Sequence, residues 1–243
     1  MNLKILFVGI ATERVQDFVE DSTTVEGIVF DRRIPHLEYE FYEHIASDTL
    51  MEAIVEAEKK GFDAAVIGCF YDPGLREARE LVKMPVVGVC EASLSLASMI
   101  SAGKFSVLVG RRKWIPKMMA TAKGYGLDSR IASWRVLGLT VPMMRDVEKS
   151  RAAIYREAKV AMEEDMAECV VLGCTGMVGQ ARDVQKELGI PILDPVLCGL
   201  KVAEMMAILW RRFGISHSKI GGYEPPPPDE FKAIFKKVYG KPP

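Results

Sequence analysis

The chain has 243 residues, which is enough for one large α/β domain or two smaller lobes and too many for a small disulfide-stapled module. Hydrophobic residues make up 49% and charged residues 27% of the chain, a globular composition that excludes wholesale disorder. The 32 lysines and arginines nearly balance the 33 aspartates and glutamates, and no long block of either sign occurs. Nothing in this charge pattern indicates nucleic acid or an anionic membrane as a partner.

Short apolar runs alternate with longer helical stretches along the chain, which is the pattern of parallel strands joined by helical crossovers. Residues 1–10 contain an apolar run without the small-residue cleavage site of a signal peptide, so we interpret it as the first strand. No later apolar run approaches the roughly 20 residues of a membrane-spanning helix, and we expect a cytoplasmic protein. Strands are predicted at residues 4–8, 27–30, 64–67, 86–89, 105–109, 135–139, 169–172 and 192–193.

The two halves of the chain repeat each other. The sequence DAAVIGC at residues 63–69 aligns with ECVVLGC at residues 168–174, an offset of 105 residues. Nearly the same offset relates Pro85 to Pro191. We therefore predict an α/β fold of two pseudo-symmetric lobes, residues 1–103 and 104–195. Each lobe is expected to hold a four-stranded, mainly parallel sheet flanked by helices, with the active site in the cleft between the lobes.

The last part of the chain does not follow this repeat. Residues 196–213 are rich in Leu, Ala and Met and end in basic residues, which predicts a final helix that returns to the first lobe. Residues 214–243 form a proline-containing extension with four consecutive prolines, followed by an amphipathic piece at residues 231–238. We expect this extension to lie outside the core.

Two of the five cysteines stand at positions that favour chemistry. Cys69 and Cys174 each end a predicted buried strand, and ligands of open parallel sheets bind at this carboxyl edge. After Cys69, Asp72 and Pro73 are typical of a helix start, and the amides of such a start lower the pKa of a nearby thiol. A lone cysteine at a strand end is ordinarily a packing residue, but duplication at equivalent positions favours catalysis. We predict that these thiols face each other as acid and base.

The residues that follow the strands are candidates to line the substrate. Glycines let the backbone approach a ligand, and a threonine offers a hydroxyl group. The predicted substrate-binding residues are Gly9, Ile10, Phe70, Tyr71, Thr175 and Gly176. The remaining cysteines are expected to be packing residues, because Cys90 matches no cysteine in the other half, Cys169 starts a predicted strand and Cys198 lies on a predicted helix.

Other kinds of site find little support in the sequence. The three histidines, at positions 36, 44 and 217, show no metal-ligand spacing, so no metal is predicted and a Cys-His nucleophile is the less favoured alternative. The loop after the first strand lacks both the Gly-x-Gly-x-x-Gly series and a Walker lysine, so it is not predicted to bind a nucleotide.

Three segments together resemble the hydantoin racemase family of the aspartate/glutamate racemase superfamily. They are GCFYDPGL at residues 68–75, PVVGVCEA at 85–92 and VLGCTGM at 171–177, and the likeness extends over nearly the whole chain. The resemblance implies a two-lobed fold that uses no cofactor. It also implies two cysteines that flank a chiral carbon, so that one removes the hydrogen and the other replaces it. The implied partner is a small molecule, and a homo-oligomer is left open.

The chain departs from the superfamily at positions that bear on the substrate. Where members commonly carry an Asn-Pro-Asn turn, this chain has Gly9-Ile10-Ala11, and the polar residues that follow the cysteines of amino-acid racemases are replaced by Phe70-Tyr71 and Thr175-Gly176. These choices favour a neutral ring, and the predicted reaction is racemisation at C5 of a 5-substituted hydantoin or a related cyclic ureide such as allantoin. The alternatives are an aspartate/glutamate-type racemase, a maleate isomerase or arylmalonate decarboxylase-like enzyme, and a non-enzymatic protein that binds a small molecule.

Overall fold

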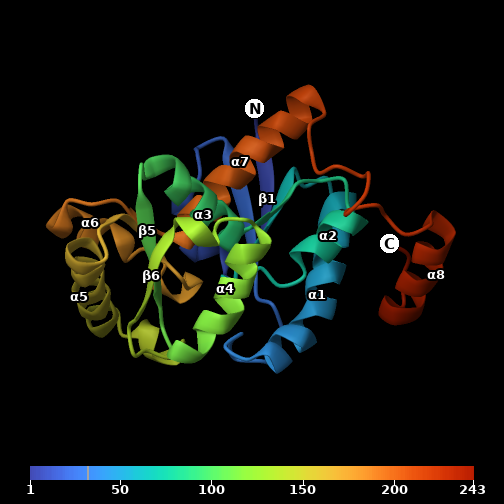
Figure 1. The fold of residues 1–243 in the computed structure, drawn as a ribbon. Coiled ribbons are helices and arrows are strands. Elements are labelled where there is room, and N and C mark those ends of the chain that lie inside the picture. Colours follow the sequence, from blue (N-terminus) through green and yellow to red (C-terminus); the bar gives the residue numbers. More distant parts are fainter. Residues whose placement is uncertain (32) are drawn as a thin grey trace. The chain divides into compact units, whose positions relative to one another are not determined.

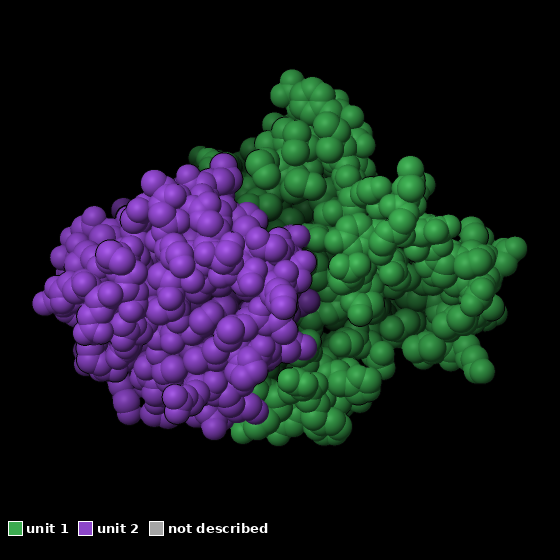
Figure 2. All heavy atoms as spheres, viewed as in Figure 1, with its two compact units in different colours: residues 1–67, 73–87, 200–243 green, residues 68–72, 88–199 purple. Residues whose placement is uncertain are grey.

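The computed structural model describes residues 1–31 and 33–243. These residues divide into two compact units, coloured separately in Figure 2. Unit 1 consists of Met1–Ile67, Pro73–Val87 and Leu200–Pro243, and unit 2 of Gly68–Asp72 and Gly88–Gly199. The short segment Gly68–Asp72, which carries Cys69, therefore belongs to the same unit as Cys174.

Unit 1 is built on a parallel sheet with the strand order β2-β1-β3-β4 (Figure 1). Its strands are β1 (Leu3–Val8), β2 (Thr23–Ile28), β3 (Ala64–Ile67) and β4 (Val86–Gly88). Strand β1 pairs in parallel with both β2 and β3, and every residue of β3 is buried because helices cover both faces of a central parallel strand. The crossover helices are α1 (Glu40–Lys59) and α2 (Leu75–Leu81).

Unit 2 repeats this topology with the strand order β6-β5-β7-β8. Its strands are β5 (Lys104–Val109), β6 (Ile131–Val136), β7 (Ala167–Leu172) and β8 (Ile192–Leu193). Its helices are α3 (Val89–Ile100), α4 (Ile115–Gly124), α5 (Val147–Glu164) and α6 (Ala181–Leu188). All three strand pairs are parallel, and α5 and α6 lie side by side (Figure 1). The predicted α/β fold with two four-stranded parallel sheets is confirmed.

Short 3-10 helices connect many of these elements within the described residues. They are η1 (Thr12–Arg14), η2 (Gln16–Phe18), η3 (Arg112–Trp114), η4 (Asp128–Arg130), η5 (Pro142–Arg145) and η6 (Thr175–Met177). In the same residues, no helix has the length and apolar character needed to cross a membrane.

Two predicted strands have different bounds in the structure. Strand β2 begins at Thr23 and β6 at Ile131, each four residues before the predicted start at residues 27 and 135. Both are edge strands, and their residues are partly exposed, so polar side chains interrupt the apolar run that marks a buried strand. The central strands β1, β3, β5 and β7 are mostly apolar, and the structure places them within about two residues of the predicted bounds.

The compact units also group one helix differently from the predicted halves. Residues 88–103 were placed with the first lobe, whereas helix α3 lies in unit 2, where it packs against β5 and β7. Helix α7 (Pro195–Phe213) begins in unit 2, and its residues from Leu200 onward belong to unit 1 together with the end of the chain.

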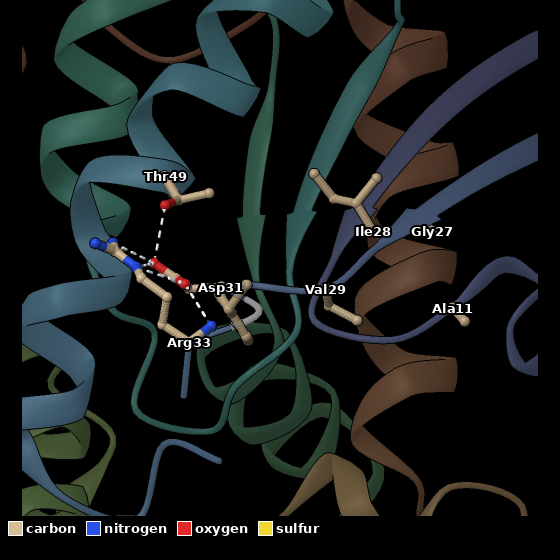
Figure 3. Close-up of a pocket in the computed structure, with 8 residues that line it drawn as sticks. Ala11, Gly27, Ile28, Val29, Asp31, Arg33 and Thr49 are labelled. Atoms are coloured by element: carbon tan, nitrogen blue, oxygen red, sulfur yellow. Dashed lines mark hydrogen bonds and ion pairs between the residues drawn. The ribbon is translucent and has the colours of Figure 1, made fainter. Parts of the chain in front are cut away.

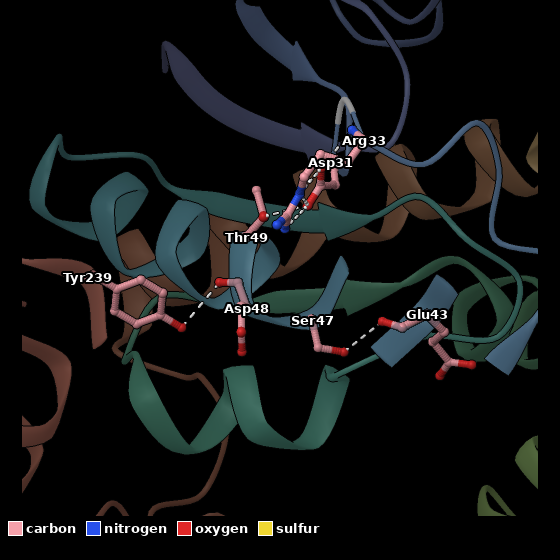
Figure 4. A network of polar contacts seen from close by, with 7 residues as sticks. All are labelled: Asp31, Arg33, Glu43, Ser47, Asp48, Thr49 and Tyr239. Carbon is pink, nitrogen blue, oxygen red and sulfur yellow. Dashed lines mark hydrogen bonds and ion pairs between the residues drawn. The ribbon is translucent and has the colours of Figure 1, made fainter. Parts of the chain in front are cut away.

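The proline-containing extension ends in a helix that contacts unit 1 through one buried side chain. In helix α8 (Pro228–Tyr239), the side chain of Phe235 is 2% exposed and its ring centroid lies 4.5 Å from that of Tyr239. The Tyr239 hydroxyl donates to the carbonyl oxygen of Asp48 on α1 at 3.2 Å (Figure 4). Aromatic residues spaced four apart form one face of the helix, and this face is what docks.

Candidate functional site

Cys69 lies in a tight turn directly after strand β3. The backbone amide of Asp72 donates to the carbonyl oxygen of Cys69 at 2.9 Å and closes the turn. Asp72 has a φ of +49°, in the left-handed region that aspartate tolerates better than most residues. Cys69 itself is partly exposed.

Asp72 caps a different helix from the one that the sequence predicts. Helix α2 begins only at Leu75, after Gly74, and receives no side-chain cap. The Asp72 carboxyl instead accepts the backbone amides of Cys90 and Glu91, both at 2.9 Å, at the amino end of α3. The turn of Cys69 is thereby fixed to α3.

The space that the Asp72 carboxyl occupies exists because residue 88 is a glycine. A Cβ on Gly88 would lie 2.4 Å from the carboxyl carbon of Asp72, which is far inside van der Waals contact. The carboxyl also accepts a hydrogen bond from the Tyr125 hydroxyl at 2.8 Å. Burial raises the pKa of Asp72 to about 7, and burial together with the nearby Asp72 charge raises the pKa of Tyr125. Asp72 is buried in this cluster, and Tyr125 is partly exposed.

Cys174 lies in an equivalent turn after strand β7. The amide of Met177 donates to the carbonyl oxygen of Cys174 at 3.2 Å, in the same pattern, three residues on, as in the turn of Cys69. Cys174 precedes η6, and its sulfur accepts a hydrogen bond from the amide of Gly176 at 3.4 Å. An amide that points at sulfur favours the thiolate over the thiol. The arrangement suits a thiol that takes up and releases a proton.

A hydrogen bond joins the two cysteine turns inside unit 2. The hydroxyl of Thr175, next to Cys174, donates to the carbonyl oxygen of Gly68, next to Cys69, at 2.9 Å. Residues adjacent to the two cysteines are therefore in direct contact although they lie 107 positions apart in the chain. The Thr175 hydroxyl, which the sequence predicted to line the substrate, donates its hydrogen bond between the two turns instead.

The other three cysteines have the character of packing residues. Cys90, Cys169 and Cys198 are buried, in contrast to the partly exposed Cys69 and Cys174. Burial raises the pKa of the Cys169 and Cys198 thiols to about 12 and that of Cys90 well above its ordinary value. These thiols stay protonated at neutral pH, as expected of small buried hydrophobic groups.

Three further predicted residues surround the cysteines in unit 2. Phe70 is 1% exposed and Tyr71 is 7% exposed, so both rings pack inside the protein, and the Lys117 ammonium lies 5.9 Å from the centroid of the Tyr71 ring. A Cβ on Gly176 would lie 3.4 Å from both the Cys174 sulfur and the Met144 sulfur. A side chain at residue 176 would thus contact both of these sulfur atoms.

The remaining predicted residues, Gly9 and Ile10, belong to unit 1 and are described there. The amide of Gly9 donates to the carbonyl oxygen of Ile28 at 2.6 Å, and Ile10 is buried. A Cβ on Gly27 would lie 2.4 Å from the carbonyl oxygen of Ile10, so this glycine allows the loop to cross the end of β2. The loop is a packed connection between β1 and β2, further held by the Thr12 hydroxyl, which accepts the amide of Gly27 at 2.9 Å.

A pocket of about 610 Å³ opens in unit 1 beside the carboxyl ends of β1 and β2 (Figure 3). One wall carries the Asp31 carboxylate, which accepts hydrogen bonds from the Arg33 Nε at 3.0 Å and the Thr49 hydroxyl at 3.3 Å (Figures 3 and 4). The bonds from Arg33 hold the pKa of Asp31 below its ordinary value. The pocket is lined by Ala11, Gly27, Ile28, Val29, Phe30, Asp31, Arg33 and Thr49. Neither cysteine, nor Gly9 or Ile10, is among these residues.

In the part of the chain that the structure describes, no group of three or more His, Cys, Asp or Glu residues is placed to hold a metal ion. Sequence reasoning missed Tyr125 and the role of Gly88. Tyr125 contacts Asp72 across 53 positions, and no local pattern marks it. Gly88 lies in one of the segments that resemble the hydantoin racemase family, and the steric need for a glycine there depends on the Asp72 carboxyl.

Comparison with known proteins bears on the chemistry of this site. Residues 12–203 match the sequence profile described as Asp/Glu/Hydantoin racemase. A hydantoin racemase of Pseudomonas sp. (strain NS671) is 37% identical over 80% of this chain and 77% of its own length. A hydantoin racemase of Paenarthrobacter aurescens is 36% identical over 88% of this chain and 89% of its own length. The solved structure of an allantoin racemase from Klebsiella pneumoniae matches with a TM-score of 0.85 and 27% identity, covering 93% of this chain and 94% of that one.

Proposed function

This chain belongs to the Asp/Glu/hydantoin racemase family, and we propose that it is a racemase that inverts C5 of a hydantoin-type ring with Cys69 and Cys174 as acid and base. The resemblance that the sequence carried is thereby confirmed. The substrates named for its relatives, hydantoins and allantoin, share one ring with a hydrogen on the stereogenic carbon C5. The proposed substrate is this ring with a substituent at C5, and the proposed reaction uses no cofactor.

The bond between Thr175 and Gly68 is the observation that most supports the pair of thiols. It holds the turns of the two partly exposed cysteines together, whereas the other three cysteines are buried and protonated. Each turn places its cysteine at the carboxyl end of a parallel strand, where ligands of this class of sheet bind. The amide of Gly176, which donates to the Cys174 sulfur, further favours an ionisable thiol at this position.

The proposed reaction moves one proton off the ring and another onto it. The thiolate of one cysteine takes the hydrogen from C5 and becomes a thiol, while the electron pair of the broken C–H bond moves into the ring as an enolate. The thiol of the other cysteine then gives its proton to the opposite face of C5 and becomes a thiolate. The enzyme ends with the two protonation states exchanged, which is the form that acts on the product enantiomer. Backbone amides after each cysteine are the proposed donors to the enolate oxygen.

The test is racemisation in deuterated water, starting from a single enantiomer of 5-benzylhydantoin or of allantoin. With wild-type protein, the optical rotation of the substrate solution should fall to zero, and deuterium should appear at C5 of the substrate. Cys69→Ala and Cys174→Ala should each reduce racemisation by about a hundredfold or more, because a positioned acid or base contributes about 10² to 10⁴. Each variant should still exchange the C5 hydrogen of one enantiomer, since the remaining thiol returns deuterium to the face from which it took the proton.

The matched control is Cys169→Ala, which removes a buried thiol from strand β7 and should leave racemisation within about twofold of wild type. Full racemisation by either Cys69→Ala or Cys174→Ala would refute the two-thiol mechanism. Turnover of aspartate, maleate or an arylmalonate in place of the hydantoins would instead assign the chain to another reaction of the superfamily.

A further inference from the structure

A buried aspartate ties the turn of Cys69 to the amino end of a helix. Asp72 closes this turn through its own amide, and its carboxyl accepts the two amides at the start of α3, at 2.9 Å each. The whole residue is only 6% exposed. A loop that carries a catalytic group is thus pinned, by one side chain, to a rigid element.

A second buried aspartate, Asp194, ties the loop that follows Cys174 to the amino end of a helix. Asp194 lies at the amino end of α7, where one carboxyl oxygen accepts the amide of Val196 at 2.9 Å. Its other oxygen accepts the amide of Gly179 at 2.7 Å. Gly179 ends the short run of turns that begins at Cys174, and Asp194 is 2% exposed. In this half the aspartate belongs to the helix and reaches the loop.

These two contacts join equivalent parts of the internal repeat, although the two aspartates stand at different positions in it. The alignment that pairs Pro85 with Pro191 also pairs Gly88 with Asp194. Where the second half carries the aspartate, the first half carries a glycine, and the Asp72 carboxyl fills the space that a side chain on Gly88 would need. Both halves therefore bind the cysteine loop to the start of the next helix through one carboxyl group, supplied from different positions.

Neither carboxyl is placed to take part in the chemistry, since both are buried and directed at backbone amides. Burying a carboxyl group is costly unless it is well paired, so its presence in both halves calls for a function. Both halves must hold a thiol in a defined position, because each thiol is proposed to approach the same carbon from its own face. Small displacements of a catalytic group reduce rates strongly.

We propose that Asp72 and Asp194 are paired positioning residues, Asp72 for the Cys69 thiol and Asp194 for the Cys174 thiol. This inference rests on the proposed function, because it gives each thiol a separate task. It has a specific consequence: removing one carboxyl disturbs one thiol and leaves the other as it was.

Steady-state racemisation cannot reveal this difference. The two enantiomers have equal free energy in water, so kcat/KM is the same in both directions for every variant. The measurement must see each thiol by itself. Alkylation by iodoacetamide, followed residue by residue with peptide mass spectrometry, does so without any turnover, and it therefore remains informative even if the racemase function is refuted.

The variants Asp72→Asn and Asp194→Asn suit the test, because asparagine caps a helix about as well as aspartate while one of the two carboxyl oxygens is lost. In Asp72→Asn the alkylation rate of Cys69 should change by about threefold or more, the size of a shift of roughly half a pKa unit, while that of Cys174 stays as in wild type. In Asp194→Asn the alkylation rate of Cys174 should change by about threefold or more, while that of Cys69 stays as in wild type. Asp183→Asn, which removes a half-exposed carboxylate from α6 in the same unit, should change neither.

Further variants keep the test decisive if an asparagine variant does not fold. Tyr125→Phe removes one of the three donors to Asp72 and should change Cys69 alone. Asp194→Ser keeps a capping oxygen for Val196, but a single oxygen cannot also reach Gly179, so this variant should change Cys174 alone. Deuterium exchange provides the second readout: in each variant the enantiomer served by the disturbed thiol should exchange about tenfold more slowly relative to the other enantiomer. The Cys69→Ala and Cys174→Ala variants identify which enantiomer each thiol serves.

Equal changes at both thiols, or no change at either, would overturn the proposal. Such results would assign the two aspartates to general stability. Racemisation that survives in Cys69→Ala or Cys174→Ala would refute the proposed function instead, and the alkylation pattern would still decide whether the aspartates position the thiols.

Discussion

The close approach of Gly88 to Asp72 yields a prediction whose size can be worked out from the structure. In Gly88→Ala, the new Cβ would lie 2.4 Å from the Asp72 carboxyl carbon and 2.4 and 2.7 Å from its oxygens. The backbone of Gly88, with φ −88° and ψ 136°, suits alanine, so any cost is steric. The carboxyl cannot swing aside freely, since three donors hold it: the amides of Cys90 and Glu91 and the Tyr125 hydroxyl.

Two responses compete, and their costs set the magnitude. Moving the backbone at residue 88 is an overpacking change that costs about 1 to 3 kcal/mol. Expelling the carboxyl leaves two amides and a buried hydroxyl without partners, at about 1 to 3 kcal/mol each. The backbone shift is the cheaper response, so we expect Gly88→Ala to lower the free energy of unfolding by about 1 to 3 kcal/mol.

Urea unfolding followed by circular dichroism measures this loss, and a double-mutant cycle locates its cause. In an Asp72→Ala background the clash is gone, and adding Gly88→Ala should cost about 0.5 kcal/mol or less. Gly124→Ala is the matched control, because no atom lies within 4 Å of a Cβ at this helical position, and it should be neutral or slightly stabilising. A cost for Gly88→Ala that is undiminished in the Asp72→Ala background would refute the steric explanation.

Further predictions concern pH, thiol reactivity and the terminal helix. Burial raises the pKa of Asp72 to about 7 against roughly 4 in the unfolded chain, so the folded state holds a proton that the unfolded state has released. The free energy of unfolding is therefore highest below about pH 4 and falls as the pH rises from 4 to 7, by on the order of 4 kcal/mol in all. Urea midpoints from pH 5 to 8 should therefore fall in wild type and lose this slope in Asp72→Asn; equal slopes would contradict the assignment. Iodoacetamide should label Cys69 and Cys174 in the folded protein, whereas Cys90, Cys169 and Cys198 should react only after unfolding, and early labelling of any of these three would argue against their burial. Phe235→Ala should destabilise the docking of α8 by about 3 kcal/mol and speed proteolysis of the tail, while Ile234→Ala, at a half-exposed position, should cost under about 0.5 kcal/mol; equal effects would show that α8 is not anchored through Phe235.

Much of this protein follows from local sequence patterns. Strands β1, β3, β5 and β7 were predicted within about a residue or two because a central parallel strand is covered on both faces and is therefore mostly apolar. The internal repeat gave the equivalence of the two sheets, and its Gly-Cys elements singled out Cys69 and Cys174 among five cysteines. Edge strands β2 and β6 were placed less well, because their exposed faces carry polar residues.

What only the tertiary structure decided is the set of partners that fix these cysteine turns. Asp72 has the local signature of a cap for the helix that follows it, yet its carboxyl serves α3, 18 positions away in the chain, and receives a hydroxyl 53 positions away. Hydrogen-bond partners at such distances leave no periodic trace, since they depend on where the chain returns and on the absence of a side chain at Gly88. The sequence by itself therefore predicted which residues are proposed to do the chemistry, because strand ends and repeats are local. The fold decided how they are held, because the groups that hold them meet only when the chain is folded.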